Sequence, residues 1–317
     1  MKLNELNLKL PQWQEDLQQH YGAEDNFINI QYEPKSNLCY RTYNSTSTDI
    51  MPIVAIHGWT LNSLTFHKVA QQLKDNNNNF FALDMHGCGM TAYIKKQNDS
   101  TQECYSWDMQ SNSVKIWADN VLGKDKPYIL LGQDSGAIIA RYVGARDELV
   151  KAIAMVNTEA AKHRPPRTQL YRISLFLPYS EPAFKFTLGQ DAFINSILGF
   201  KSYFHNINNL KNPEFQLRII QPLLDTIDGQ AAFIKGWDFS ELDKIDGIHQ
   251  QITVPLAMIW GTDDKNFPLK NAQSIRDNTK TDNSNIKIIE VKGCGAFVQE
   301  EKPEILAQEI LELLNKV

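Results

Sequence analysis

The chain has 317 residues, of which 42% are hydrophobic and 22% charged, with 16 glycines and 13 prolines. This composition is typical of a soluble globular protein and excludes disordered and collagen-like chains. The formal net charge is −5 and no Lys/Arg block is present, which argues against nucleic acids and anionic membranes as partners. We expect a small, neutral molecule as substrate or ligand.

Targeting and metal-binding signals are absent from the sequence. No apolar run is long enough for a signal peptide or a membrane span, so we expect a cytoplasmic protein. The four cysteines form no CxxC pair and no Cys/His cluster with zinc spacing. We therefore expect no disulfide framework, no metal and no cofactor, and we leave a homodimer open.

Strand-like runs alternate with amphipathic, helix-like stretches through most of the chain. Eight runs rich in β-branched and aromatic residues have strand character: 27–33, 37–43, 52–57, 80–84, 128–132, 151–157, 255–260 and 286–291. The first two follow each other closely and predict an antiparallel hairpin at a sheet edge. Helical patterns separate the later runs, which predicts an α/β fold with a mostly parallel, eight-stranded sheet between helices.

The alternation of strands and helices breaks between residue 159 and about residue 242. This segment is rich in proline and aromatic residues, and its periodicity is helical. We interpret it as a helical cap inserted between the sixth and seventh strands. The predicted organisation is a first core part at 1–160, the cap at 161–242 and a second core part at 243–317.

The fifth strand runs into the sequence GQDSG, which has the small-x-nucleophile-x-small pattern of a nucleophile elbow. The flanking residues of such a turn must be small so that the following helix can pack close to the strand. Centring the turn on Asp134 puts Gly132 and Gly136 at the flanks. Centring it on Ser135 would put the bulky Gln133 there. Asp134 is therefore the predicted nucleophile, with a plain helix N-cap as its alternative.

A pair of backbone donors is predicted beside this turn. The third strand ends in His-Gly-Trp-Thr, at the position that supplies the second amide of an oxyanion hole. We expect the backbone N–H groups of Trp59 and Ser135 to face the nucleophile, and the Trp59 indole to face a leaving group or to pack. His86, in the glycine-rich turn after the fourth strand, is interpreted as structural.

In combination, these motifs resemble the aspartate-nucleophile branch of the α/β-hydrolase superfamily, which includes epoxide hydrolases and haloalkane dehalogenases. The resemblance covers about residues 25–317 and rests on HGW, DMHGCGMT, GQDSG, WGTDD with a later proline, and KGCGAFVQEE. It implies an α/β-hydrolase fold with an inserted cap. It also implies that an aspartate attacks carbon to form an ester, which a histidine held by an acid then hydrolyses.

The resemblance assigns the other catalytic positions. The family pattern G-x-x-D-x-x-x-P implies Asp264 as the acid, with a helix-capping role as its alternative. Some dehalogenases carry the acid after the preceding strand, where Glu159 is the reserve candidate. Ala296 occupies the place of the usual histidine, because the branch commonly reads GHFVQE where this chain reads GAFVQE. A methyl group cannot take a proton from water, so we expect impaired turnover, whether the replacement is natural or deliberate.

Other residues bear on the substrate. His163 is the one positional substitute for the missing histidine, with a cap-hinge or surface role as its alternative. Tyr171, Tyr179 and Tyr203 resemble, in type and region, the cap tyrosines that donate hydrogen bonds to an epoxide oxygen, with packing as the alternative. Ser135 stands where dehalogenases place tryptophan or arginine, which favours an epoxide-like or unassigned neutral substrate.

We therefore expect a hydrolase-fold protein that attacks a small apolar electrophile with Asp134. Two alternatives stay open. One is a non-catalytic ligand-binding protein on the same fold, because a fold does not dictate a function. The other is a serine hydrolase, against which the register of the elbow argues.

Overall fold

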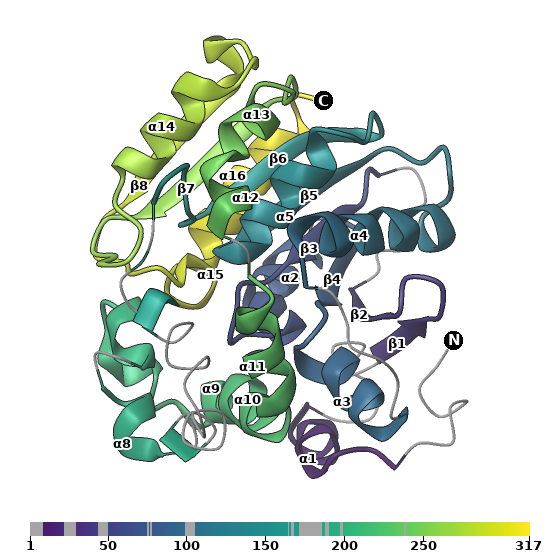
Figure 1. Cartoon of the computed structure of the whole chain (residues 1–317), viewed down its shortest axis with the longest axis vertical. Coiled ribbons are helices and arrows are strands. Elements are labelled where there is room, and N and C mark those ends of the chain that lie inside the picture. Colours follow the sequence, from purple (N-terminus) through teal and green to yellow (C-terminus); the bar gives the residue numbers. More distant parts are fainter. Residues whose placement is uncertain are drawn as a thin grey trace.

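An eight-stranded sheet runs through the molecule between two layers of helices (Figure 1). The computed structural model describes residues 9–21, 30–43, 50–74, 76, 78–98, 105–163, 165, 168–170, 186–187, 190–196, 199–237 and 239–317. The strands are β1 (Ile30–Glu33), β2 (Leu38–Tyr43), β3 (Ile53–Ile56), β4 (Phe80–Asp84), β5 (Tyr128–Gln133), β6 (Val150–Val156), β7 (Leu256–Gly261) and β8 (Ile286–Val291).

The order of the strands is β1-β2-β4-β3-β5-β6-β7-β8. β1 pairs antiparallel with β2, and β2 pairs antiparallel with β4. All the other neighbours pair in parallel. The predicted edge hairpin and the mostly parallel, eight-stranded sheet are both confirmed.

Helices cover both faces of this sheet. The longer helices of the described residues, on these faces or at one end of the sheet, are α1 (Gln12–Tyr21), α2 (His67–Lys74), α3 (Gly89–Asn98), α4 (Trp107–Val121), α5 (Ser135–Gly144), α11 (Ile227–Lys235), α14 (Lys270–Asn278) and α16 (Pro303–Leu314). The shorter ones are α8 (Asp191–Ile194), α9 (Pro213–Phe215), α10 (Gln221–Asp225), α12 (Phe239–Asp243), α13 (Ile245–His249), α15 (Val298–Glu301), η3 (Ser63–Phe66), η4 (Phe200–Tyr203), η5 (Ile207–Asn209), η6 (Gln216–Ile220) and η7 (Asn283–Asn285).

The sheet divides the core into two apolar layers, because successive side chains of a strand point to opposite faces. In β5, Tyr128 and Leu130 pack with residues of α4 and α5. Ile129 and Leu131 pack on the other face with residues of α2 and α16. Burial on both faces explains why the central strands read as continuous apolar runs rather than as an alternating pattern.

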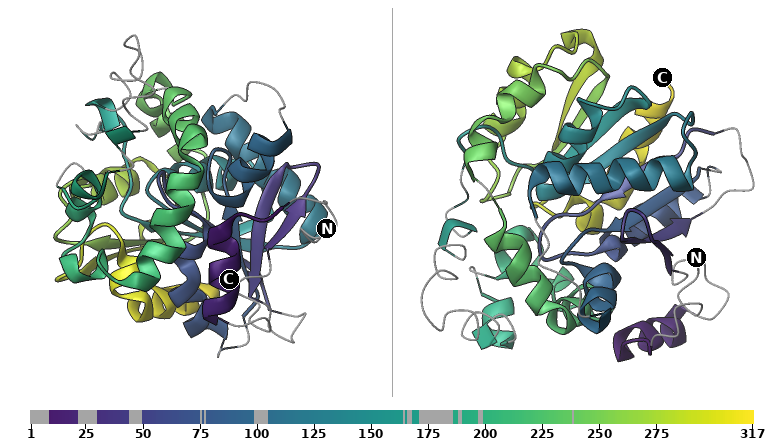
Figure 2. Two further views of the ribbon diagram at one scale, coloured as in Figure 1. Left: turned by 90° about the horizontal axis from the view of Figure 1, so that it is seen from below. Right: turned by 45° about the vertical axis from the view of Figure 1, so that its right-hand side comes forward.

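Between β6 and β7, the described residues form helices and turns and no strand. Figure 2 shows α10 and α11 gathered at one end of the sheet. α11 lies over the loops that follow β3 and β4: the Trp59 indole donates a hydrogen bond to the Gln230 carbonyl (3.1 Å), and Gly87 and Gly229 approach closely. The helical character of this insertion agrees with the prediction, whereas its boundaries at 161 and 242 stay a prediction.

A buried ion pair joins the insertion to the core. Arg218 of η6, a turn of π-helix, donates to both carboxylate oxygens of Glu300 in α15, at 3.0 and 2.9 Å. It also donates to the Leu64 carbonyl at 2.6 Å. Arg218 Nε also lies 3.2 Å from Glu214 Oε1, and helix α1 joins this group because the Tyr21 hydroxyl donates to the same oxygen at 2.7 Å. Charged side chains therefore tie together three segments that are distant in the sequence.

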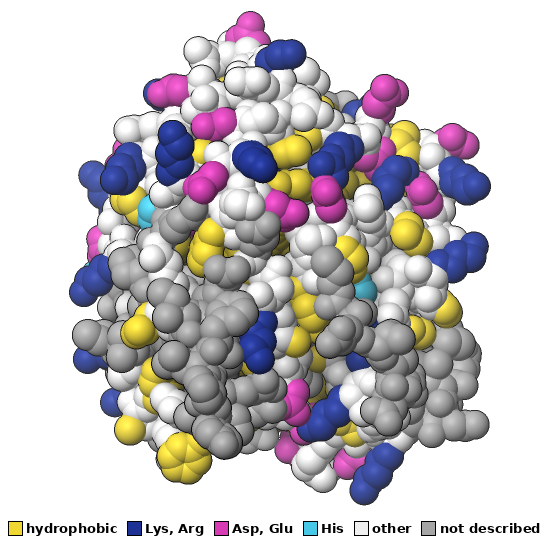
Figure 3. All heavy atoms as spheres, in the orientation of Figure 1, with side chains coloured by type: hydrophobic (Ala, Val, Ile, Leu, Met, Phe, Trp, Pro, Cys, Tyr) yellow, Lys and Arg dark blue, Asp and Glu magenta, His cyan; other side chains and the backbone are white. Residues whose placement is uncertain are grey.

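Positive and negative side chains are interspersed over the upper part of the face seen in Figure 3. Mixed signs of this kind are usual for a protein surface and create no strong field of one sign. Among the described residues, no helix combines the length and apolar character that crossing a membrane requires.

Candidate active site

Asp134 stands at the apex of the turn between β5 and α5, with φ 53° and ψ −127°. An L-residue rarely adopts this backbone geometry, which is a form of strain that concentrates at functional sites. The turn needs its small flanks. A Cβ on Gly132 would lie 2.4 Å from the Cα of Ala137, and a Cβ on Gly136 would lie 2.1 Å from the Ile56 carbonyl oxygen. The structure thus places Asp134 where the glycine frame predicts it, while its nucleophilic role stays a prediction.

Neighbouring groups hold this strained residue in place. The Asp134 backbone N–H donates to the carbonyls of Val156 and Asn157 at the end of β6, both at 3.1 Å. The Asp134 carbonyl accepts from the Thr158 hydroxyl at 2.7 Å. Arg141 of α5 donates in turn to that hydroxyl oxygen at 3.0 Å. Each backbone polar group of the apex residue therefore has a partner, which offsets part of the cost of the strain.

The two predicted amide donors lie beside Asp134, and the structure gives each of them an acceptor. The Ser135 N–H donates to Asp134 Oδ1. The Trp59 N–H donates to Ser135 Oγ at 2.8 Å. Oδ1 of the carboxylate is thus held by an amide. Sequence reasoning missed that the Ser135 hydroxyl accepts the hydrogen bond of the Trp59 amide. The Trp59 indole donates its hydrogen bond to the insertion rather than facing a leaving group.

Asp264 follows β7 and is clamped by two asparagines. The Asn157 side-chain amide donates to its Oδ2 at 2.8 Å, and the Asn266 backbone N–H donates to its Oδ1 at 2.8 Å. Asn157 is itself fixed, since its Oδ1 accepts from the Gly261 N–H at 2.8 Å. Burial raises the pKa of Asp264 to about 6. The hydrogen bonds from the two asparagines have the opposite effect on this pKa but do not outweigh burial.

Asn157 contacts Asp264, the predicted acid, and the reserve role of Glu159 as the acid stays a prediction. Sequence reasoning missed Asn157, although a polar residue directly after a buried strand was a usable signal. Its φ of 27° is also unusual for a residue other than glycine.

Glu159 is completely buried close to the elbow. Its Oε2 lies 3.3 Å from the Thr158 hydroxyl oxygen, and its Oε1 has no hydrogen-bond partner among the described residues. Burial raises the pKa of this carboxyl to about 7. A hydrogen bond with the Glu159 backbone and the charge of Arg141 oppose that shift, and Asp264 adds to it. Glu159 thus forms a second buried carboxyl group near Asp134.

Ala296 is fully buried in the larger apolar cluster, and the loop around it packs against the insertion. The rings of Phe297 and Tyr203 stack with their centroids 4.8 Å apart and an interplanar angle of 6°. A Cβ on Gly295 would lie 2.1 Å from the Tyr203 carbonyl oxygen. Tyr203 therefore packs on the loop of the missing histidine. Tyr171 and Tyr179 lie outside the described residues.

Two histidines singled out from the sequence occupy different settings. His86 has its Nε2 2.8 Å from Ser113 Oγ and its Nδ1 2.9 Å from Lys95 Nζ, which agrees with a structural role. The ring centroids of His163 and Phe267 are 6.0 Å apart, and Phe267 belongs to the loop that carries Asp264. Burial is the main reason that the pKa of His163 falls to about 4, so its imidazole is neutral near pH 7.

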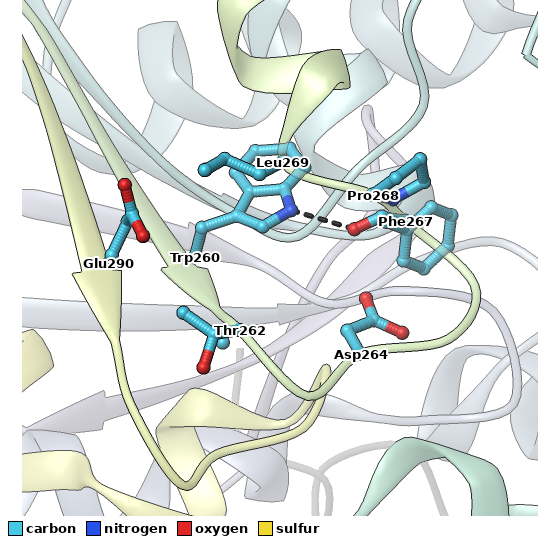
Figure 4. A pocket seen from close by; sticks show the side chains of 8 residues that line it. Trp260, Thr262, Asp264, Phe267, Pro268, Leu269 and Glu290 are labelled. Atoms are coloured by element: carbon cyan, nitrogen blue, oxygen red, sulfur yellow. Dashed lines mark hydrogen bonds between the residues drawn. The ribbon is translucent and has the colours of Figure 1, made fainter.

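A cavity of about 340 Å³ borders the acid loop (Figure 4). It is lined by Trp260, Gly261, Thr262, Asp264, Phe267, Pro268, Leu269 and Glu290. The Trp260 indole N–H donates to the Phe267 carbonyl across it at 2.7 Å. Asp134 does not line this cavity and is 6% exposed. The expected cavity in front of Asp134 stays a prediction.

Comparison with known proteins agrees with this architecture. Residues 51–303 match the family model of the alpha/beta hydrolase fold. The epoxide hydrolase CorEH is 18% identical with a TM-score of 0.68, over 88% of this chain and 95% of that one. The enol-lactonase from Burkholderia xenovorans LB400 is 15% identical with a TM-score of 0.67, over 88% and 96%.

MenH from S. aureus is 18% identical with a TM-score of 0.67, over 87% of this chain and 98% of that one. Similarities at this level of identity establish the fold alone, since one fold carries several chemistries. Among curated proteins, none has a sequence that matches the chain.

Proposed function

Because the chain belongs to the α/β-hydrolase fold family, we propose that it attacks a small neutral electrophile with the carboxylate of Asp134 and forms an alkyl ester. An epoxide is the favoured substrate class. The observation that carries the proposal is the position of Asp134 at the strained apex of the elbow, with Oδ1 on the Ser135 amide. The similarity to a fold relative that is an epoxide hydrolase gives weaker support.

The hydrogen bond to Oδ1 assigns different tasks to the two carboxylate oxygens. Oδ2 attacks the electrophilic carbon, and the bond from that carbon to the epoxide oxygen breaks. The electron pair moves to that oxygen, which then takes up a proton from solvent and becomes a hydroxyl group. Oδ1 becomes the carbonyl oxygen of the ester, already placed on an amide donor that can stabilise negative charge during hydrolysis.

Ala296 makes the second half of the reaction the slow one. A histidine at this position would take a proton from water as the water attacks the ester carbon. A methyl group offers no lone pair, so the alkylated protein should persist longer than in a protein that has the histidine. Attack by Asp134 itself needs no base.

A serine hydrolase is the less favoured reading. Ser135 lies one residue beyond the apex, and its Oγ accepts a hydrogen bond from the Trp59 amide. The hydroxyl thus occupies a donor that a serine enzyme would reserve for the oxyanion of its substrate. A purely ligand-binding protein on the same fold is the other alternative, and it would leave Asp134 unmodified.

The test is intact-protein mass spectrometry after incubation with terminal epoxides and primary haloalkanes. We expect a mass increase equal to one epoxide, or, for a haloalkane, to one alkyl group less the hydrogen that it replaces, and we expect peptide mapping to place it on Asp134. The matched control is Asp134→Asn, which keeps the size of the side chain and removes the nucleophile. An unmodified protein across the panel, or an adduct that survives Asp134→Asn, contradicts the proposal.

A further inference from the structure

Hydrolysis of an ester on Asp134 needs a proton acceptor, and Ala296 cannot be one. A substitute has to lie close to the elbow. It also has to keep a lone pair that no structural hydrogen bond uses. These two requirements can be applied to the histidines and carboxylates that surround the turn.

Six of the seven histidines fail these requirements. Three are buried with both ring nitrogens in contact with other polar groups: His57, His86 and His249. Three have their contacts away from the elbow. His20 and His67 have ring contacts with Tyr21, and His205 forms an exposed ion pair with Asp263. The remaining one, His163, also keeps a ring nitrogen, Nδ1, without a partner among the described residues. Its ring contacts Phe267 rather than the elbow, and burial and the charge of Lys270 lower its pKa to about 4, which makes it a weak base.

The two buried carboxyl groups differ in how their oxygens are used. Both oxygens of Asp264 accept hydrogen bonds, from Asn157 and from Asn266. Glu159 keeps Oε1 without a partner among the described residues, although its side chain is completely buried. A buried polar atom without a partner is costly, so its presence calls for a functional explanation. A water molecule or a reacting group would satisfy it.

Glu159 also meets the requirement of position. β5 and β6 are parallel neighbours, so the residues after their carboxyl ends meet at the same edge of the sheet. Thr158 bonds to the Asp134 carbonyl, and Glu159 Oε2 lies 3.3 Å from the same hydroxyl oxygen. The carboxylate is therefore within two hydrogen-bond lengths of the nucleophile's backbone.

The charges around Glu159 suit a base that acts near neutral pH. Arg141 from α5 and Asp264 from the loop after β7 are the charged groups that face it. Arg141 is buried and contacts His249, which in turn contacts Asp246 of α13. Burial raises the pKa of Glu159 to about 7, although Arg141 favours its ionised form. A base is most effective when its pKa lies near the working pH.

We propose that Glu159 is the general base that hydrolyses the Asp134 ester in place of the missing histidine. This rests on the proposed function above. The Glu159 carboxylate takes a proton from water while the water oxygen bonds to the ester carbon. The electron pair of the carbonyl moves to Oδ1, on the Ser135 amide. When the intermediate collapses, the bond from carbon to the alkyl oxygen breaks. The alcohol leaves with the proton from Glu159, and the new Asp134 carboxyl releases its own proton to solvent.

The experiment separates alkylation from ester hydrolysis. The full-length protein and its Glu159→Gln variant are alkylated with a terminal epoxide, freed of reagent, and followed by intact mass between pH 5.5 and 8.5. We expect the unaltered protein to lose the adduct at a rate that rises with pH around a midpoint near 7, where Glu159 ionises. Glu159→Gln should lose it slower by about two to four orders of magnitude, with a similar alkylation rate.

Two further variants sharpen this test. Glu159→Asp keeps the carboxylate but shortens the side chain by one methylene. We expect it to lose the adduct at a rate between those of the unaltered protein and Glu159→Gln. His163→Gln removes the rival base and should leave the rate unchanged. Equal rates for the unaltered protein and Glu159→Gln, or a loss confined to His163→Gln, overturn the proposal. If Glu159→Gln does not fold, a pH-independent rate in the unaltered protein overturns it. An absence of adduct in every variant refutes the proposed function and this inference with it.

Discussion

Arg218→Met should strongly reduce the free energy of unfolding, because it removes one partner of the buried ion pair that holds the insertion on the core. The Arg218 side chain is 0% exposed and that of Glu300 is 1% exposed. Without the guanidinium, Glu300 would keep Lys68 as its nearest cation, at 3.2 Å. Removing one member of a buried pair typically costs about 3–5 kcal/mol. We expect a value near the lower end, about 3 kcal/mol, since Lys68 partly compensates.

A double variant and a surface control test the stated reason. Arg218→Met with Glu300→Gln should be more stable than Arg218→Met alone, because the fully buried charge of Glu300 is removed together with its partner. The control is Arg146→Met, which breaks the pair with Asp108, where the side chains are 41% and 55% exposed. Such a pair contributes about 1 kcal/mol or less.

Urea unfolding at pH 7, followed by circular dichroism and tryptophan fluorescence, measures these free energies. Coincident transitions from the two signals would show that the insertion and the core unfold together. The reasoning is refuted if Arg218→Met and Arg146→Met lose the same free energy, or if the double variant is no more stable than the single one.

The remaining predictions concern the site. In the Glu159→Gln background, which lacks the proposed base, Ala296→His should speed loss of an Asp134 adduct by about two to four orders of magnitude, measured by intact mass; an unchanged rate in a folded double variant contradicts the role assigned to this position. Gly58→Ala should slow alkylation by about 10²-fold, because its Cβ would lie 2.5 Å from the Asp134 Cβ, whereas Gly247→Ala, with no atom within 4 Å, should not. Glu159 has a folded pKa of about 7 against an ordinary 4.5, so its contribution to stability is present below pH 4.5 and is lost as the pH rises through 7. Urea unfolding should therefore show a shallower fall between pH 4.5 and 7 for Glu159→Gln, and equal slopes would contradict the assignment.

The fold could be predicted because its signals are local. In the sequence, buried parallel strands are continuous apolar runs separated by helical patterns. The nucleophile elbow is indicated by two glycines at a fixed spacing. Gly132 and Gly136 are needed for the reason that the sequence suggests: the close approach of α5 to the strands. The apex position of Asp134 follows from the same spacing.

The contacts within the site could not be predicted, because they join residues that are distant in the sequence. Nothing near Asn157 shows that it will clamp Asp264, which is more than a hundred residues away. The link from the Trp59 indole to Gln230 depends on how the insertion folds over the sheet.

The hydrogen bond from the Trp59 amide to Ser135 Oγ has a practical consequence for detection. Fluorophosphonates and related reagents label serine hydrolases by reaction with a serine oxygen that a neighbouring histidine has activated. Ser135 is fully buried and off the apex, and no histidine among the described residues hydrogen-bonds to it. Proteome profiling with such reagents would pass over this chain, whereas the proposed nucleophile Asp134 predicts labelling by epoxide or haloalkane probes that alkylate carboxylates.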